Sequence, residues 1–78
     1  GGIARIRIYG FMEIKKKFGS NVRDLRKLAN ISQEELALRL NADQAYVSRI
    51  EAGQMNVTLE TIDEISKALN VSAKEFFE

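Results

Sequence analysis

The sequence contains no cysteine, no histidine and no proline. The absence of cysteine excludes a disulfide framework, and the absence of both cysteine and histidine removes the thiolate and imidazole ligands of the common metal sites. The usual Cys–His and Ser–His nucleophile arrangements are excluded for the same reason, so the sequence does not predict an enzyme. We expect neither a metal nor a cofactor.

Long apolar runs are missing as well. The longest runs are two or three residues, whereas a membrane-spanning helix needs about 18 apolar residues, and no signal-peptide pattern is present. We therefore expect a soluble, cytoplasmic protein with no membrane partner. Its 78 residues suffice for one domain, and a second domain is not expected.

Charge is distributed unevenly, although the net charge is only +1. Residues 1–30 hold eight basic and two acidic residues, a net charge of +6, so residues 31–78 carry −5. A basic first third is compatible with one face that meets phosphates while another avoids them. An ordinary solvated charge run explains this pattern about equally well.

Hydrophobic spacing predicts helices along most of the chain. From Phe11 to Leu28 apolar residues recur at steps of three or four, which predicts one amphipathic helix over about 12–29, with Gly19 weakening its middle. Four later helix starts each have a capping residue ahead of the apolar pattern. The caps are Ser32, Asp43, Thr58 and Ser72, and Glu35 and Glu75 complete capping boxes with the first and the last.

The later helices are expected over about 33–40, 44–52 and 59–69, with a fifth opened by Ser72. Two turn residues support these boundaries. Asn41 stands where the chain must turn sharply, and asparagine is the non-glycine residue best suited to a left-handed backbone conformation. Gly53 is the residue expected at a left-handed helix stop.

The first eleven residues do not fit a helix. Apolar and polar residues alternate with period two from Ile3 to Tyr9, which is a strand signal without a partner strand. The segment is therefore interpreted as an N-terminal extension, residues 1–11, ahead of a domain over 12–78. It is a basic arm that touches DNA, an edge strand that pairs across a dimer, or a disordered remnant of processing or tagging before a native start at Met12.

Two short helices joined by about four residues, over 33–52, have the size of a helix-turn-helix unit. Ala37 is small where the two helices would cross, and apolar side chains supply the inward positions. The other face of the second helix is left pointing outward. That face carries Gln44, Ala45, Ser48 and Arg49.

The run Ser32–Ala37, SQEELA, and the run Asn41–Gly53, NADQAYVSRIEAG, resemble the lambdoid-repressor or Xre-type helix-turn-helix family. The resemblance extends over about 13–78. Further runs are similar to the controller proteins of restriction–modification systems. These are Phe18-Gly19 through Leu25-Arg26-Lys27, Tyr46-Val47-Ser48 and Asn56-Val57-Thr58-Leu59.

The resemblance implies an all-α, five-helix, lambda-repressor-like DNA-binding domain. Its implied function is that of a sequence-specific transcriptional regulator, which acts as a dimer on a (pseudo)palindromic operator. Among the relatives, the controllers imply autoregulation within a restriction–modification system. Nothing in the chain suggests a sensor or a small-molecule ligand, so regulation is expected to follow protein concentration.

The resemblance also implies that Gln44 enters the major groove and that Gln33 contacts a phosphate and braces Gln44. A glutamine amide carries a donor and an acceptor on one fork and matches adenine N6 and N7, a pair worth roughly 1–3 kcal/mol of discrimination. Arg49 is expected to reach guanine or a phosphate, Ser48 shares its face, and Ala45 meets only a thymine methyl. The controllers usually have a basic residue where this chain has Gln44, so its operator cannot be copied from theirs.

Helix N-termini present free N–H groups to anions, which favours phosphate contacts near the starts of two helices. For Tyr46, packing against a neighbouring helix is an equally good alternative to a phosphate contact. The expected phosphate-contacting residues are Arg23, Gln33, Tyr46, Gln54, Asn56 and Thr58. Arg26 and Glu51 match a family pair that forms an internal salt bridge, so they are interpreted as structural.

A dimer is expected because a single recognition helix reads only a few base pairs. In the controllers the last two helices make the dimer, and two adjacent phenylalanines cannot both point into one small core. The predicted interface comprises Ile65, Leu69, Phe76 and Phe77. The alternative is that both phenylalanines cap the core of the monomer.

The expected partners are double-stranded DNA, a second copy of the chain and RNA polymerase. Two other functions remain open. One is a prophage or antitoxin-type repressor that holds a protein partner through its acidic C-terminal helices. The other is a helix-turn-helix used only as a protein-interaction module, which the outward polar face of the second helix argues against.

Overall fold

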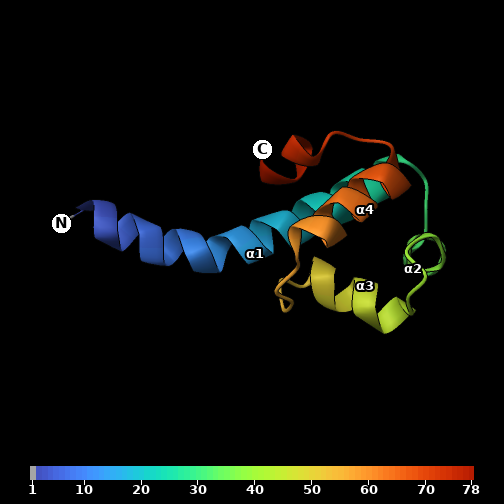
Figure 1. Cartoon of the computed structure of the whole chain (residues 1–78), viewed down its shortest axis with the longest axis horizontal. Helices are drawn as coiled ribbons and strands as arrows, with labels where there is room; N and C mark the ends of the chain where they lie inside the picture. The colour runs from blue at the N-terminus through green and yellow to red at the C-terminus, as the bar shows by residue number, and fades with distance from the viewer. Residues whose placement is uncertain (1) are drawn as a thin grey trace.

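The computed structural model describes the backbone from Gly2 to Glu78 and the side chains from Ile14 onward. Over that range the fold is all-helical and has no strand (Figure 1). None of the helices described is long and apolar enough to cross a bilayer. The elements are α1 (Gly2–Leu28), α2 (Gln33–Arg39), α3 (Gln44–Glu51), α4 (Leu59–Leu69) and the 3₁₀ helix η1 (Ala73–Phe77).

The last element corrects the expectation of five α-helices. Residues opened by Ser72 do form a helix, but it is a 3₁₀ helix of five residues. Such tight helices occur in short pieces because their hydrogen-bond geometry is poorer than that of an α-helix. The backbone N–H of Ser72 donates to the Glu75 carboxylate over 3.2 Å, which is the expected contact from Glu75 to the cap residue.

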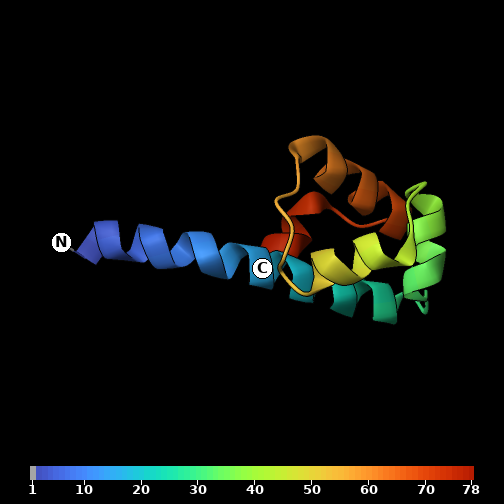
Figure 2. The same cartoon turned by 90° about the horizontal axis from the view of Figure 1, so that it is seen from below.

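The edge strand, one of the three interpretations left open for residues 1–11, is wrong, because α1 is continuous from Gly2 through Leu28. A lone strand leaves its backbone groups without partners, whereas a helix satisfies them within the segment. The start of α1 therefore projects away from the other helices (Figures 1 and 2), and the long dimension of the molecule is 44 Å. A DNA-touching arm would depend on side chains of residues 1–11, which lie outside the described residues.

Three helix starts are capped as the sequence predicts. The side-chain oxygens of Ser32, Asp43 and Thr58 each accept the backbone N–H three residues further on, over 3.0, 2.9 and 3.1 Å. One expected detail is wrong: the Glu35 carboxylate does not return to Ser32 but pairs with Arg39, at 3.1 Å. A partner one helical turn away on the same face competes successfully with the capping position.

Residues with a left-handed backbone conformation follow the helices, so that the chain turns within a few residues. Asn41 and Gly53 have φ of 58° and 74°, as the sequence predicts. Asn30 and Asn70 adopt the same conformation, with φ of 61° and 57°. Asparagine tolerates this region of backbone space better than most residues with a side chain.

The core lies around α1, with α3 packed on one side of this helix and η1 on another (Figures 1 and 2). Gly19 has a role that helix propensity does not reveal, because it lets α1 approach the backbone of α3 closely. Aromatic contacts join α1 to η1, where Phe18 meets Phe76 edge-on at 5.2 Å. The buried apolar residues are Phe18, Val22, Leu36, Ala37, Val47, Ile50, Ile65, Leu69 and Phe76.

Candidate nucleic-acid interface

The α2–turn–α3 unit has one buried and one exposed side. Ala37 and Val47 are buried, and the turn is closed by the Ala42 N–H donating to the Ala37 carbonyl over 2.9 Å. Because apolar side chains of α3 fill the inward positions, its polar side chains are left at the surface. The exposed residues of α3 include all four predicted base-contacting residues, Gln44, Ala45, Ser48 and Arg49.

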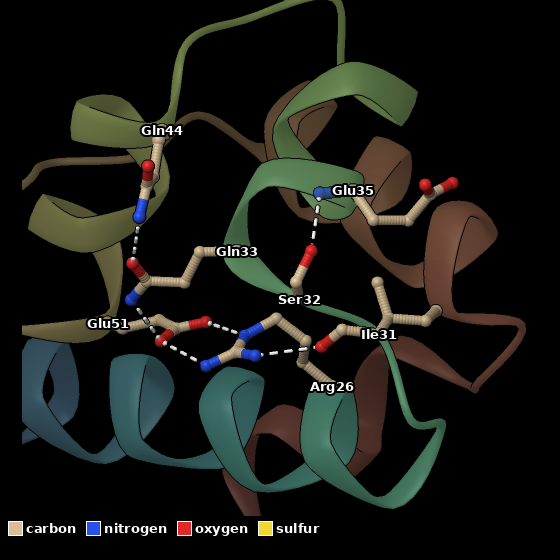
Figure 3. A network of polar contacts seen from close by, with 7 residues as sticks. All are labelled: Arg26, Ile31, Ser32, Gln33, Glu35, Gln44 and Glu51. Atoms are coloured by element: carbon tan, nitrogen blue, oxygen red, sulfur yellow. Dashed lines mark hydrogen bonds and ion pairs between the residues drawn. The ribbon is translucent and has the colours of Figure 1, made fainter.

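A chain of polar contacts runs from this exposed face into the interior (Figure 3). Gln44 Nε2 donates to Gln33 Oε1 over 3.3 Å, so the two glutamines predicted to act together do lie in contact. Gln33 Nε2 in turn donates to Glu51 Oε1 over 3.0 Å. The side chain that begins α3 is therefore connected, through the first residue of α2, to the last residue of α3.

The interior end of this chain is an ion pair. Arg26 Nε and one terminal nitrogen donate to the two oxygens of Glu51 over 2.6 and 3.1 Å. A further nitrogen of Arg26 donates to the Ile31 carbonyl over 2.8 Å. The side chains of Arg26 and Glu51 are only 9% and 4% exposed. Arg26 is thus engaged in holding α1, α3 and the start of α2 together, and its charge does not face solvent.

An open polar groove of about 400 Å³ lies beside this network. Two of its residues, Arg23 and Lys27, are exposed bases one helical turn apart on α1. The sequence interpretation missed Lys27, although its spacing of four from Arg23 places both on one helix face. The lining residues are Arg23, Arg26, Lys27, Gln33, Ser48, Glu51 and Ala52.

Comparison with known proteins agrees with this geometry. Residues 22–76 match the family model described as helix-turn-helix. This chain belongs to the helix-turn-helix family. Within it, the chain is similar to the control protein C.BamHI of Bacillus amyloliquefaciens, with 42% identity over 83% of this chain and 82% of the relative.

Two solved structures extend the likeness of this helix-turn-helix protein. The restriction–modification controller protein C.AhdI from Aeromonas hydrophila is 40% identical, with a TM-score of 0.75, over 80% of this chain and 90% of that one. The controller protein C.Esp1396I, solved as a tetramer in complex with its natural 35 base-pair operator, is 33% identical, with a TM-score of 0.73. That match covers 82% of this chain and 84% of the other. The resemblance to controller proteins noted from the sequence is confirmed.

The residues expected to contact phosphates lie in three places in this helix-turn-helix protein. Arg23 and Gln33 lie at the polar groove beside α3. Tyr46 packs partly buried against the hydrophobic core, which is the alternative the sequence left open. The remaining three are exposed in the segment between α3 and α4, where the Thr58 hydroxyl is already engaged as a cap. They are Gln54, Asn56 and Thr58.

Three of the four predicted dimer residues belong to the core of the single chain. Ile65, Leu69 and Phe76 are buried there, so they offer little surface to a partner. Phe77 is 40% exposed and stacks on Phe18, with ring centroids 5.6 Å apart. A neighbouring apolar groove of about 190 Å³ includes Phe77. Its lining residues are Ile14, Lys15, Phe18, Met55, Asn56, Val57, Ile62 and Phe77.

Among the side chains described, no cluster of three or more acidic residues could hold a metal ion. Two ion pairs, Lys67 with Asp63 at 3.0 Å and Arg39 with Glu35 at 3.1 Å, lie on exposed helix faces. The polar atoms of the interior are all bonded within the part of the chain that the structure describes. The exposed face of α3 offers hydrogen-bonding groups at Gln44 and Ser48 and a positive charge at Arg49.

Proposed function

We propose that this chain is a sequence-specific DNA-binding transcriptional regulator that controls a restriction–modification system. The names of its relatives, which include a restriction–modification controller protein, support this proposal. The observation that carries the proposal is the exposed polar face of α3, with Gln44 held by Gln33 at 3.3 Å beside a groove that has two bases at its rim. A surface built in this way offers hydrogen bonds to base edges and charges to phosphates side by side. This protein would act in the cytoplasm, on double-stranded DNA.

In the proposed complex α3 lies in the major groove. Gln44 reads adenine through its amide, Arg49 reads guanine or a neighbouring phosphate, and Ser48 and Ala45 line the same face. Arg23, Lys27 and Gln33 hold the phosphates of the flanking backbone. Such backbone contacts set the register of the protein on the duplex, and base contacts set its sequence preference.

The protein is proposed to act as a dimer on two related half-sites. A dimer places two recognition helices about 34 Å apart, one turn of DNA. Phe77 and the apolar groove beside it are the surface we assign to the contact between protomers. Support comes from the 40% exposure of Phe77 and from the position of η1, which lies on a different side of α1 from α3 (Figure 1).

Regulation is proposed to follow protein concentration, through dimer formation and binding to the promoter of the gene that encodes the chain. RNA polymerase is the proposed partner through which a bound dimer changes transcription. The named relatives, which are control proteins of restriction–modification systems, support this assignment. The contacts proposed for Gln44 and Arg49 require no cofactor and no small molecule.

A binding measurement tests the proposal. Fluorescence anisotropy at about 150 mM salt would compare the DNA upstream of the coding sequence with a scrambled duplex of equal length. The expected preference for the upstream DNA is at least about 1,000-fold, since specific sites are typically bound that much more tightly than random DNA. Gln44→Ala should reduce this preference, and Lys67→Ala, on the exposed face of α4, should not. Equal affinity for both duplexes would refute the proposed function.

A further inference from the structure

We propose that Glu51, whose side chain is only 4% exposed, is a positioning residue that sets the direction of the Gln44 amide and thereby its base preference. The inference rests on the proposed function and adds a residue to it. It starts from the hydrogen-bonded chain that joins Arg26, Glu51, Gln33 and Gln44 (Figure 3).

The buried ion pair determines the donor-to-acceptor direction of these hydrogen bonds. A guanidinium has only N–H donors, and a carboxylate has only acceptors. Arg26 donates to both oxygens of Glu51, so Glu51 can only accept from its next neighbour as well. The interior pair is hardly exposed, which limits the competition of water for the same bonds.

Gln33 passes this direction on. A glutamine amide has one end that donates and one that accepts, and rotation by 180° exchanges them. Because Glu51 Oε1 accepts from Gln33 Nε2 over 3.0 Å, the Gln33 oxygen is turned away from Glu51 and toward Gln44. Gln44 must then donate to that oxygen, as it does over 3.3 Å. The exposed glutamine thus has its orientation chosen by a buried carboxylate.

The orientation matters because adenine presents an acceptor, N7, next to a donor, the N6 amino group. A glutamine amide satisfies both only when its own donor and acceptor stand in the matching order. A reversed amide would set donor against donor and acceptor against acceptor. The chain from Glu51 therefore favours one order at the base edge over the other.

Glu51→Gln tests this directly, because it replaces an acceptor-only group by one that can also donate. Arg26 Nε would keep the oxygen of the new amide, the terminal nitrogen of Arg26 would lose its acceptor, and the N–H groups of the new amide would face Gln33. Gln33 would then turn its oxygen toward residue 51 and its N–H groups toward Gln44. The direction of the whole chain would reverse with no change of volume.

The experiment compares four duplexes that differ only at the base pair facing Gln44. The wild-type protein is expected to prefer adenine, and Glu51→Gln to lower that preference about tenfold, within the range of one bidentate contact. Gln33→Ala breaks the link, so Gln33→Ala and the double variant Gln33→Ala/Glu51→Gln should share one base preference. An unchanged preference in Glu51→Gln, or an equal shift in the Gln33→Ala background, would overturn the inference while leaving the proposed function intact. Equal affinity of the wild-type protein for the upstream DNA and a scrambled duplex would refute both.

Loss of folding in Glu51→Gln would be detected by circular dichroism, and a second measurement needs only the wild-type protein. The side-chain amide protons of Gln33 should exchange with solvent more slowly than those of the exposed Gln54. Equal exchange for the two amides, measured by nuclear magnetic resonance on the free protein, would show that Glu51 does not hold Gln33. The inference would then fail without reference to DNA.

Discussion

Gly19 of α1 lies directly against the carbonyl oxygen of Ile50 in α3. A Cβ atom added at Gly19 would stand 2.2 Å from that oxygen and 2.8 Å from the carbonyl oxygen of Glu51. Real Cβ atoms do not approach backbone atoms so closely, and neither carbonyl can rotate away as a flexible side chain could. The packing of α1 on the recognition helix therefore depends on the absence of a side chain at this position.

Gly19→Ala is expected to lower the free energy of unfolding by about 1–3 kcal/mol, the usual cost of overpacking. The sign is informative, because alanine in a helix interior is otherwise favoured over glycine by about 1 kcal/mol. Urea denaturation of the two proteins measures the difference. Ser20→Ala, at the exposed neighbouring position, is the matched control and should change stability little. A Gly19→Ala protein more stable than the wild type would contradict the close approach.

The sequence predicts the local features of this fold and misses the distant ones. Caps such as Ser32 and Thr58 act within three residues, so the chain alone reveals them. The role of Gly19 depends on a residue 31 positions away, and the sequence offers only its low helix propensity. The alternation over residues 3–9 was misleading because a period-two pattern specifies a strand only when a partner strand exists.

Arg26→Ala is expected to lower the free energy of unfolding by about 3–5 kcal/mol, the typical result of removing one partner of a buried pair. The reason is that Glu51, 4% exposed, would lose its charged partner, and the Ile31 carbonyl would lose its donor. Chemical denaturation is the measurement. Arg23→Ala, one turn earlier at an exposed position, should change stability by less than about 0.5 kcal/mol. Equal effects of the two substitutions on the free energy of unfolding would show that the buried ion pair does not stabilise the fold more than an exposed arginine does.

Lys27→Ala is expected to weaken DNA binding to a similar degree for all sequences. If Lys27 neutralises one phosphate, the slope of log K against log salt should become shallower by about 0.9. Titrations between 50 and 200 mM salt, on operator and scrambled duplexes, give the slope. Lys67→Ala, on the exposed face of α4, should leave it unchanged. An unchanged slope for Lys27→Ala would remove the groove beside α3 from the phosphate-binding surface.

Phe77→Ser is expected to shift the protein from dimer to monomer at micromolar concentration. Phe77 is 40% exposed and borders an apolar groove, so a polar side chain there would remove apolar area from the proposed contact. Sedimentation equilibrium reports the association constant. Leu38→Ser, at a 73% exposed position on α2, is the control and should leave it unchanged. If both variants stay dimeric, the contact lies elsewhere.

The candidate site was also foreseen unevenly. The sequence pattern of a helix-turn-helix predicts which residues of α3 are exposed, and that the glutamine at the start of α2 contacts Gln44. The direction of the contact from Gln33 to Glu51 does not, because it joins residues 18 positions apart through side chains only. The dimer surface stays a prediction: Phe76 and Phe77 are equivalent in the sequence, and only packing separates the buried ring from the exposed one.

Phe18 and Gly19 are consecutive residues of α1 and lie on different faces of it, because successive side chains of an α-helix are about 100° apart. Phe18 stacks on Phe77, next to the proposed dimer contact, and Gly19 touches the backbone of α3. A single turn of α1 therefore touches both η1, next to the proposed protomer contact, and α3. A larger side chain at either contact would move the two recognition helices of the proposed dimer relative to each other. The protein would then select operators with a different spacing between the half-sites.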